Sequence, residues 1–286
     1  MDSIYKKVKN NTASTFEKDA LSNYYTIVHL KDTEYLEYKY RKQKFLLDLD
    51  YQSLCAGKKE KILSKFNLIY IEKIDVIYNS LDESYETADY HFQGDSYAYL
   101  KKMKSAGYTV VATVGRFTVQ KGLHNLMKAA AMAISKNPKL LFVFAGDGEE
   151  KNHLINLAAK LGISKNVLFT GFIRGQRLRD IYSVSDIFVM SSISEPFGLT
   201  ALEAAHHGDC LILTKQSGVS EVIWSALKYD FWDEQKLADE IIAISKNPAL
   251  KETLTKNVSK EYRQITWNQV AKKCLKTYNS IKHKRK

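Results

Sequence analysis

The feature of the sequence that most constrains the fold is a regular alternation of apolar and helical segments from about residue 108 onward. Each apolar run is followed by a short loop and then by apolar residues at helical spacing. Strands that are apolar throughout are typical of a parallel sheet that helices cover on both faces. The alternation therefore predicts an α/β fold, with a doubly wound parallel-sheet (Rossmann-like) domain. The expected strands are residues 108–115, 140–146, 167–171, 186–190 and 210–214.

Residues that can bind or react follow these strands directly. In a parallel sheet the carboxyl ends of the strands lie at one edge, and ligands bind beyond that edge. Arg116, Gly146, Gly148, Phe172 and Glu195 each come soon after an expected strand, so the topology predicts that they converge. The two glycines either let the backbone approach a ligand or form an ordinary turn. Phe172 either packs on a nucleobase or belongs to a routine loop.

The stretch SEPFGLTALEAAHHGD places two glutamates eight positions apart around a helix start. Pro and Gly favour a loop and the alanine-rich run favours a helix, which should begin near Gly198. The amides of Leu199 and Thr200 then lack intrahelical acceptors and, with the helix dipole, suit a phosphate. Glu203 lies ~7 Å further along, at ~1.5 Å per residue, where it can accept hydrogen bonds from a ribose. Glu195 lies at the other end of such a ligand. The alternative is that both carboxylates only favour the helix N-terminus electrostatically.

Two cations lie beside the first strand. Arg116 follows this strand at once, and Lys121 precedes the next helix. Arginine can bind a diphosphate through two parallel hydrogen bonds, and lysine binds it as a point charge. Preorganised cations of this kind stabilise the charge that grows on a departing phosphate. By themselves the two residues are weak evidence, but together with the paired glutamates they indicate a diphosphate site.

The net charge of +11 favours anionic partners: nucleotides, phosphorylated substrates, nucleic acid or an anionic membrane face. Nucleic-acid binding rests on charge alone, and we expect none.

Cys55, Cys210 and Cys274 show no paired spacing, which fits a reducing compartment. The sequence has no secretory signal and no long apolar run, so we expect a cytoplasmic protein.

Asp48 and Asp50 imitate an Asp-x-Asp metal motif. Because the cation pair already supplies positive charge, we expect no metal ion.

The chain is predicted to have three parts. Residues 1–78 form a reduced N-terminal α/β lobe, residues 79–268 form the parallel-sheet domain with the diphosphate site, and residues 269–286 form a basic C-terminal helix and tail. Beyond Glu261 the chain has eight Lys or Arg residues and no acidic residue. This tail is either a solvated helix end or a surface for peripheral contact with an anionic membrane or a partner.

Together these motifs resemble the retaining glycosyltransferases of family four, the glycogen-synthase-like group, which have the two-lobed GT-B fold. The resemblance runs from about residue 74 to the end of the chain. The segments that carry it are VIYNSLD, VGRFTVQKGL, FAGDGEE, LFTGFIRG and SEPFGLTALEAAHHGD. The resemblance implies that residues 1–78 are the acceptor-side lobe and that residues 79–268 are the nucleotide-sugar-binding domain.

The resemblance implies a hexosyltransferase that needs neither a metal ion nor a cofactor. It would move a hexose, with retention, from a nucleotide diphosphate-sugar to a glycan, a glycolipid or another hydroxyl acceptor. By similarity, Arg116 and Lys121 would hold the diphosphate, Glu195 would contact the donor sugar and Glu203 would contact the ribose. The backbone of residues 198–200 would bind the distal phosphate. The leaving phosphate itself would take the proton of the acceptor.

The N-terminal region departs from the family pattern. The segment TIVHLKDTEY resembles the strand-end histidine near the donor sugar, which makes His29 a further catalytic candidate. Family members have a longer segment before it, including a glycine-rich loop. Either the lobe is reduced, or a partner chain completes it, or the sequence is a fragment. The alternative function is therefore a catalytically weak donor-binding subunit or regulator that needs a partner lobe.

Overall fold

The computed structural model describes residues 76–82 and 97–283. The predicted N-terminal lobe therefore lies almost wholly outside the described residues. The candidate His29 and the pair Asp48 and Asp50 lie outside them as well.

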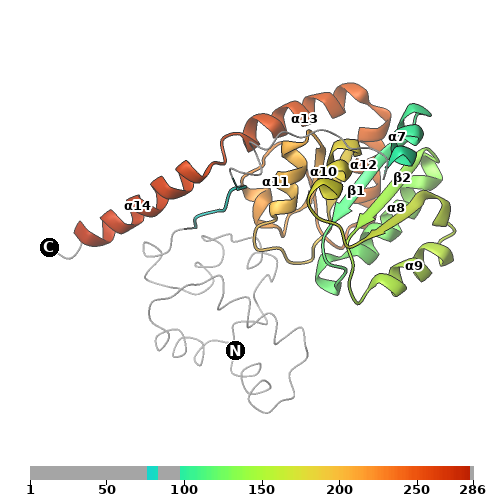
Figure 1. Cartoon of the computed structure of the whole chain (residues 1–286), viewed down its shortest axis with the longest axis horizontal. Coiled ribbons are helices and arrows are strands. Elements are labelled where there is room, and N and C mark those ends of the chain that lie inside the picture. The colour runs from blue at the N-terminus through green and yellow to red at the C-terminus, as the bar shows by residue number, and fades with distance from the viewer. Residues whose placement is uncertain (1–75, 83–96, 284–286) are drawn as a thin grey trace, which may run out of the picture.

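The core of the described domain is a six-stranded sheet in which every strand pair is parallel (Figure 1). The strand order is β3-β2-β1-β4-β5-β6, which is that of a doubly wound nucleotide-binding fold. All five expected strands are present, and a short sixth strand, which the sequence analysis did not predict, extends the sheet. The strands are β1 (Thr109–Val114), β2 (Leu140–Ala145), β3 (Val167–Gly171), β4 (Ile187–Met190), β5 (Cys210–Thr214) and β6 (Leu227–Tyr229).

Helices cover both faces of the sheet. Alternate residues of each strand point to opposite faces, so that Val111 packs against one helical layer and Val110 against the other. The first layer contains α8 (Leu123–Lys136), α9 (Lys151–Lys160) and α12 (Glu234–Lys246). The second layer contains α7 (Ala98–Ser105), α10 (Gln176–Val184), α11 (Leu199–His206) and α13 (Pro248–Tyr262).

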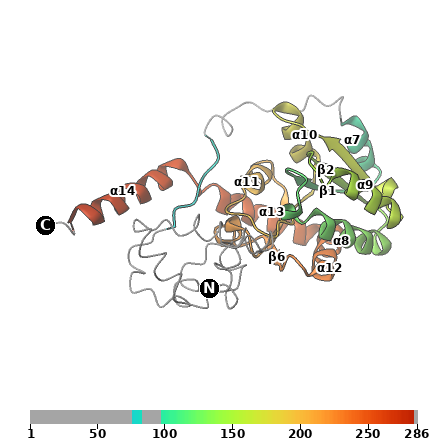
Figure 2. The ribbon, with the colours of Figure 1, turned by 90° about the horizontal axis from the view of Figure 1, so that it is seen from below.

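The helix that begins at Trp267 stands apart from these layers. Helix α14 (Trp267–His283) starts two residues before the predicted boundary at 269 and extends away from the rest of the described domain in both views (Figures 1 and 2). Its residues Leu275 and Tyr278 are 60% and 69% exposed. Within the described part of the chain, no helix is both long and apolar enough to span a membrane.

Ionic contacts fasten two helices to the amino edge of the sheet. Asp186, just before β4, is buried and accepts a hydrogen bond from the amide of Val110 at 2.9 Å. The same carboxylate pairs with Lys104 of α7 at 3.2 Å and with Lys251 of α13. These contacts lie at the edge opposite to the one where the sequence predicts a ligand.

At the carboxyl edge, the loops after β1 and β2 are pressed together. The amide of Phe117 donates to the carbonyl of Asp147 at 2.8 Å. A Cβ atom on Gly146 would lie 1.8 Å from the carbonyl oxygen of Gly115, and one on Gly148 would lie 2.4 Å from that of Phe117. The Gly-Asp-Gly turn therefore packs closely against the neighbouring loop, and an approach of its backbone to a ligand stays a prediction.

The end of α11 packs through aromatic rings. His207 stacks on the fully buried Tyr182, with ring centroids 5.8 Å apart and an interplanar angle of 16°. Burial, together with the charges of His206 and Arg179, lowers the pKa of His207 to about 4.

The glycine contact gives a first prediction. Gly146→Ala should lower the free energy of unfolding by about 3 kcal/mol, because the new Cβ forces the two loops apart. Gly162→Ala is the control: its φ of +71° is also left-handed, but no atom lies within 4 Å of the new Cβ. It should lose only about 1 kcal/mol. Urea denaturation followed by circular dichroism measures both values, and equal losses would refute the packing explanation.

His207 gives a prediction about pH. Its pKa in the folded protein lies below the unfolded value, so the unfolded chain binds a proton first as the pH falls from about 6.5 towards 4. The neutral His207 ring contributes its full share to the free energy of unfolding above about pH 6.5, and this share is lost as the pH falls to about 4. His207→Phe keeps the stacked ring and cannot titrate, so its unfolding free energy should fall less across this window, by about 1–2 kcal/mol. Parallel urea titrations at pH 7 and pH 4.5 that show identical declines would contradict the assignment.

Candidate active site

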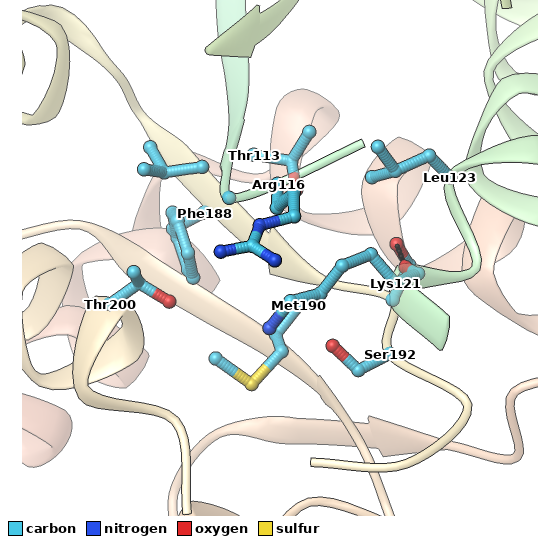
Figure 3. Close-up of a pocket in the computed structure, with 11 residues that line it drawn as sticks. Thr113, Arg116, Lys121, Leu123, Phe188, Met190, Ser192 and Thr200 are labelled. Atoms are coloured by element: carbon cyan, nitrogen blue, oxygen red, sulfur yellow. Dashed lines mark hydrogen bonds between the residues drawn. The ribbon is translucent and has the colours of Figure 1, made fainter. Parts of the chain in front are cut away.

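The candidate site lies where the order of the sheet reverses. Strand β1 pairs with β2 on one side and with β4 on the other, and the two following connections leave in opposite directions. Such a switch point opens a crevice beyond the carboxyl ends of the two strands. A pocket is found there (Figure 3). It is lined by Thr113, Val114, Gly115, Arg116, Lys121, Leu123, Phe188, Met190, Ser191, Ser192 and Thr200.

The loop that carries the two predicted cations is strapped to the end of β4. Ser191 donates its hydroxyl hydrogen bond to the carbonyl of Lys121 at 2.8 Å, and the amide of Ile193 donates to Gln120 at 2.8 Å. Gly122, with φ of +59°, lies so close that a Cβ would be 2.2 Å from the Ser191 carbonyl oxygen. The loop is thus held by its backbone, and its charged side chains are left to face the pocket.

Arg116 and Lys121 meet in this pocket, as the sequence predicts. Figure 3 shows the guanidinium of Arg116 between Thr200 and Lys121. Lys121 is paired with Glu195, with its Nζ 2.5 Å from the carboxylate Oε2. Arg116 is exposed and forms no ion pair with any carboxylate of the described residues. The pocket therefore has one positive charge that no neighbouring acid of the described domain offsets.

The N-terminus of α11 supplies further donors. Gly198 is the residue before the helix, and no side chain caps it. Within the described part of the chain, the amides of Leu199 and Thr200 donate to no acceptor, and Leu199 is 42% exposed. Open amides at the positive end of a helix attract anions. Thr200 and Arg116 both line the pocket, so the start of α11 and the guanidinium border the same space.

Gly198 has a packing role of its own. The resemblance implies that the backbone of residues 198–200 binds the distal phosphate, and this stays a prediction. In the structure the φ of Gly198 is +109°, and a Cβ would lie 2.7 Å from the Cε of Met190. The missing side chain thus makes room for Met190 and allows a left-handed backbone.

The Pro-Phe-Gly sequence between the glutamates is an anchor. Phe197 is 9% exposed, and its ring stacks on that of Tyr78, with centroids 5.5 Å apart. The carbonyl of Phe197 accepts a hydrogen bond from Val219 at 2.7 Å, and that of Glu195 accepts one from Gly218 at 3.0 Å. These contacts hold the backbone on both sides of Pro196, so the direction of the Glu195 side chain is set by the loop.

Glu203 lies on α11 and is half-buried. Its Oε2 accepts a hydrogen bond from the hydroxyl of Tyr182 at 2.7 Å. Burial raises the pKa of Glu203, and the hydrogen bond from Tyr182 opposes that rise. Glu203 follows Thr200 by three positions, which places both on one face of the helix about one turn apart.

The other predicted ligand residues do not line this pocket. Gly146 and Gly148 belong to the packed loops described above. Phe172 is 73% exposed just after β3, beyond the bridge between Gly146 and Gly171. An exposed phenylalanine at this edge can stack on a flat ring. Its packing on a nucleobase stays a prediction.

Some residues of the site were missed by sequence reasoning. Ser192 lines the pocket from the end of β4, and Thr113 from β1. Tyr78 and Tyr182 fasten Phe197 and Glu203, respectively. The position of Ser192 directly after an apolar strand could have indicated it. The tyrosine contacts join distant segments, and no local pattern reveals them.

Comparison with known proteins identifies the domain. Residues 100–261 match the family described as glycosyl transferases group 1. One similar protein, the uncharacterized glycosyltransferase MJ1607 of Methanocaldococcus jannaschii, is 29% identical over 77% of this chain and 57% of its own length. The gpi3 subunit of phosphatidylinositol N-acetylglucosaminyltransferase from Schizosaccharomyces pombe is 28% identical over 62% of this chain and 39% of its own length. The chain thus spans about half the length of these relatives.

Solved structures share the fold. Alr3699/HepE of Anabaena, crystallised with UDP and glucose, superposes with a TM-score of 0.64 and 20% identity over 78% of this chain and 61% of its own. The C-terminal domain of a group 1 glycosyl transferase, LpcC of Francisella tularensis, gives a TM-score of 0.55 and 22% identity over 65% of this chain and 97% of its own. The described sheet is therefore the Rossmann-like domain of a GT-B architecture. Because the family match covers more than half of the sequence, the chain belongs to the glycosyl transferases group 1 family.

Proposed function

We propose that the protein is a retaining hexosyltransferase that uses a nucleotide diphosphate-sugar as donor and a glycan, glycolipid or other hydroxyl compound as acceptor. The observation that carries the proposal is the meeting of two anion-binding features at one pocket. The guanidinium of Arg116 and the amides at the start of α11, which have no partner among the described residues, border the same pocket. A diphosphate between them would satisfy both.

Lys121 and Glu195 would act at the sugar end of the donor. Their ion pair holds the ammonium at the mouth of the pocket, with the lysine 28% and the glutamate 14% exposed. In the proposed reaction the bond between the anomeric carbon and the phosphate oxygen breaks. The acceptor oxygen bonds to the anomeric carbon on the same face, and its proton goes to the departing phosphate. Arg116 and Lys121 stabilise the negative charge that grows on that phosphate.

The same two cations lead us to propose that neither a metal ion nor a cofactor takes part. Each positive charge near the phosphate does part of the work that a divalent ion does in other transferases.

The proposal predicts the effect of removing each charge. Arg116→Ala and Lys121→Ala should each lower kcat by about 100-fold or more, since one preorganised donor at a developing charge contributes about 3–4 kcal/mol. Glu195→Ala should also abolish turnover, because it removes both the partner of Lys121 and the contact to the donor sugar. The assay measures free nucleotide released from UDP-, ADP- and GDP-sugars with glucan or glycolipid acceptors.

A matched control is Lys136→Ala. This residue ends α8, ~20 Å from the start of that helix at ~1.5 Å per residue, and pairs with Asp239 on the surface. It should leave turnover unchanged. Full activity of Arg116→Ala would remove the diphosphate site. Tight donor binding by the wild-type protein without turnover would instead assign the chain to a donor-binding subunit.

Metal independence has its own test. Turnover of the purified protein should be the same with excess chelator as with added Mg²⁺ or Mn²⁺. Loss of activity in chelator that either ion restores would show that a metal ion shares the work assigned to Arg116 and Lys121.

A further inference from the structure

Tyr182 is a buried residue whose hydroxyl contacts Glu203, the carboxylate that is expected to bind ribose. Its side chain is fully buried in α10, and its hydroxyl donates to Oε2 of Glu203 at 2.7 Å. The ring is held from two directions. It packs against Phe188 of β4 with centroids 5.9 Å apart, and it stacks on His207 at 5.8 Å.

This hydrogen bond restricts a side chain that would otherwise be mobile. Glutamate has three side-chain torsions, and fixing them costs rotamer entropy. A tyrosine in a packed core has its hydroxyl in one place, so it fixes the acceptor oxygen as well. Within the described residues the Glu203 carboxylate accepts no second side-chain hydrogen bond. Oε2 of Glu203 accepts the hydrogen bond from Tyr182, and Oε1 can still accept a hydrogen bond from a ligand.

The direction of α11 connects this pair to the pocket. Glu203 follows Leu199 by four positions and Thr200 by three, so the three residues share one face of the helix. Of these three residues Thr200 lines the pocket, and the amides of Leu199 and Thr200, which donate to no acceptor among the described residues, lie at the start of the same helix. A ligand whose phosphate is at the helix start and whose next group lies about one turn along would meet Glu203.

We propose that Tyr182 is a positioning residue. It holds one oxygen of Glu203 so that the other is presented to the ribose hydroxyls of a nucleoside diphosphate. The inference rests on the proposed function, since it assumes that a nucleotide occupies the pocket. It goes further by assigning recognition of the ribose to a pair of residues on two helices.

The test compares ligands that differ only in the ribose. Calorimetry first identifies which of UDP, ADP and GDP binds the wild-type protein most tightly, and then measures its 2′-deoxy and 3′-deoxy forms and inorganic pyrophosphate. In the wild-type protein, loss of the recognised hydroxyl should weaken binding about tenfold or more, as expected for a hydrogen bond to a charged group. In Tyr182→Phe this ratio should shrink to about twofold, and the affinity for pyrophosphate should stay within about twofold of wild type.

Tyr229→Phe is the matched control. Tyr229 is also fully buried, but it lies on β6 against the other helical layer, and its hydroxyl has no hydrogen-bond partner among the residues that the structure describes. The ribose ratio of this variant should equal that of wild type. Should Tyr182→Phe fail to fold, Glu203→Gln provides the second test. Its amide oxygen takes the tyrosine hydrogen bond, and its uncharged amide leaves at most a neutral hydrogen bond to the ribose, so the ratio should fall well below that of wild type.

The outcomes separate the two proposals. A wild-type protein that binds none of the nucleoside diphosphates overturns the proposed function, and this inference with it. A wild-type protein that discriminates between ribose and deoxyribose while Tyr182→Phe discriminates equally well overturns the role of Tyr182 alone. A ratio that survives in Glu203→Gln overturns the assignment of ribose recognition to Glu203, and the positioning role of Tyr182 with it. A general loss of stability would weaken pyrophosphate binding as well, so the unchanged pyrophosphate affinity excludes a merely structural effect.

Discussion

The site depends on the close approach of loop backbones at the carboxyl edge of the sheet. The loop after β1 touches the end of β4 at Gly122 and the loop after β2 at Gly146, and neither position has space for a Cβ atom. Parallel strands bring these loops to one edge, but only the backbone contacts fix their distance. Arg116 and Lys121 thus project from a loop clamped on two sides. Preorganised charge of this kind needs no rearrangement when a phosphate becomes more negative, which is why it is effective in catalysis.

The charges of the pocket are arranged unequally. Lys121 is paired with Glu195 and is therefore directed, whereas Arg116 lacks an acidic partner among the described residues and is therefore available. If both cations were paired with acids, the site would attract a diphosphate only weakly. If neither were paired, both side chains would be mobile. The combination supplies a strong net attraction from Arg116 and the α11 amides, together with one ammonium whose place is set.

Sequence reasoning reached the strands, their common edge and the meeting of Arg116 with Lys121, because these follow from periodicity and from the topology of parallel sheets. The helix start at Gly198 followed from propensity and turn chemistry. The reasons for individual residues did not follow. Met190, eight positions earlier at the end of β4, explains Gly198, and Tyr78 explains Phe197. Tyr78 and Phe197 belong to segments far apart in the chain, and the direction of a side chain in either contact depends on packing that no local pattern encodes.

The segment of residues 76–82 has a place in this arrangement that its sequence does not suggest. Tyr78 stacks on Phe197 and its hydroxyl donates to Glu221, while Ser80 donates to the carbonyl of Ile265 at 2.7 Å, two residues before α14. The segment therefore touches both the loop of Glu195 and the approach to α14. Since the Phe197 carbonyl and the Glu195 carbonyl are held by the loop after β5, a shift of Tyr78 would be carried into the backbone that aims Glu195. The segment of residues 76–82 and the loop that carries Glu195 are thus in direct contact through the stacked rings of Tyr78 and Phe197.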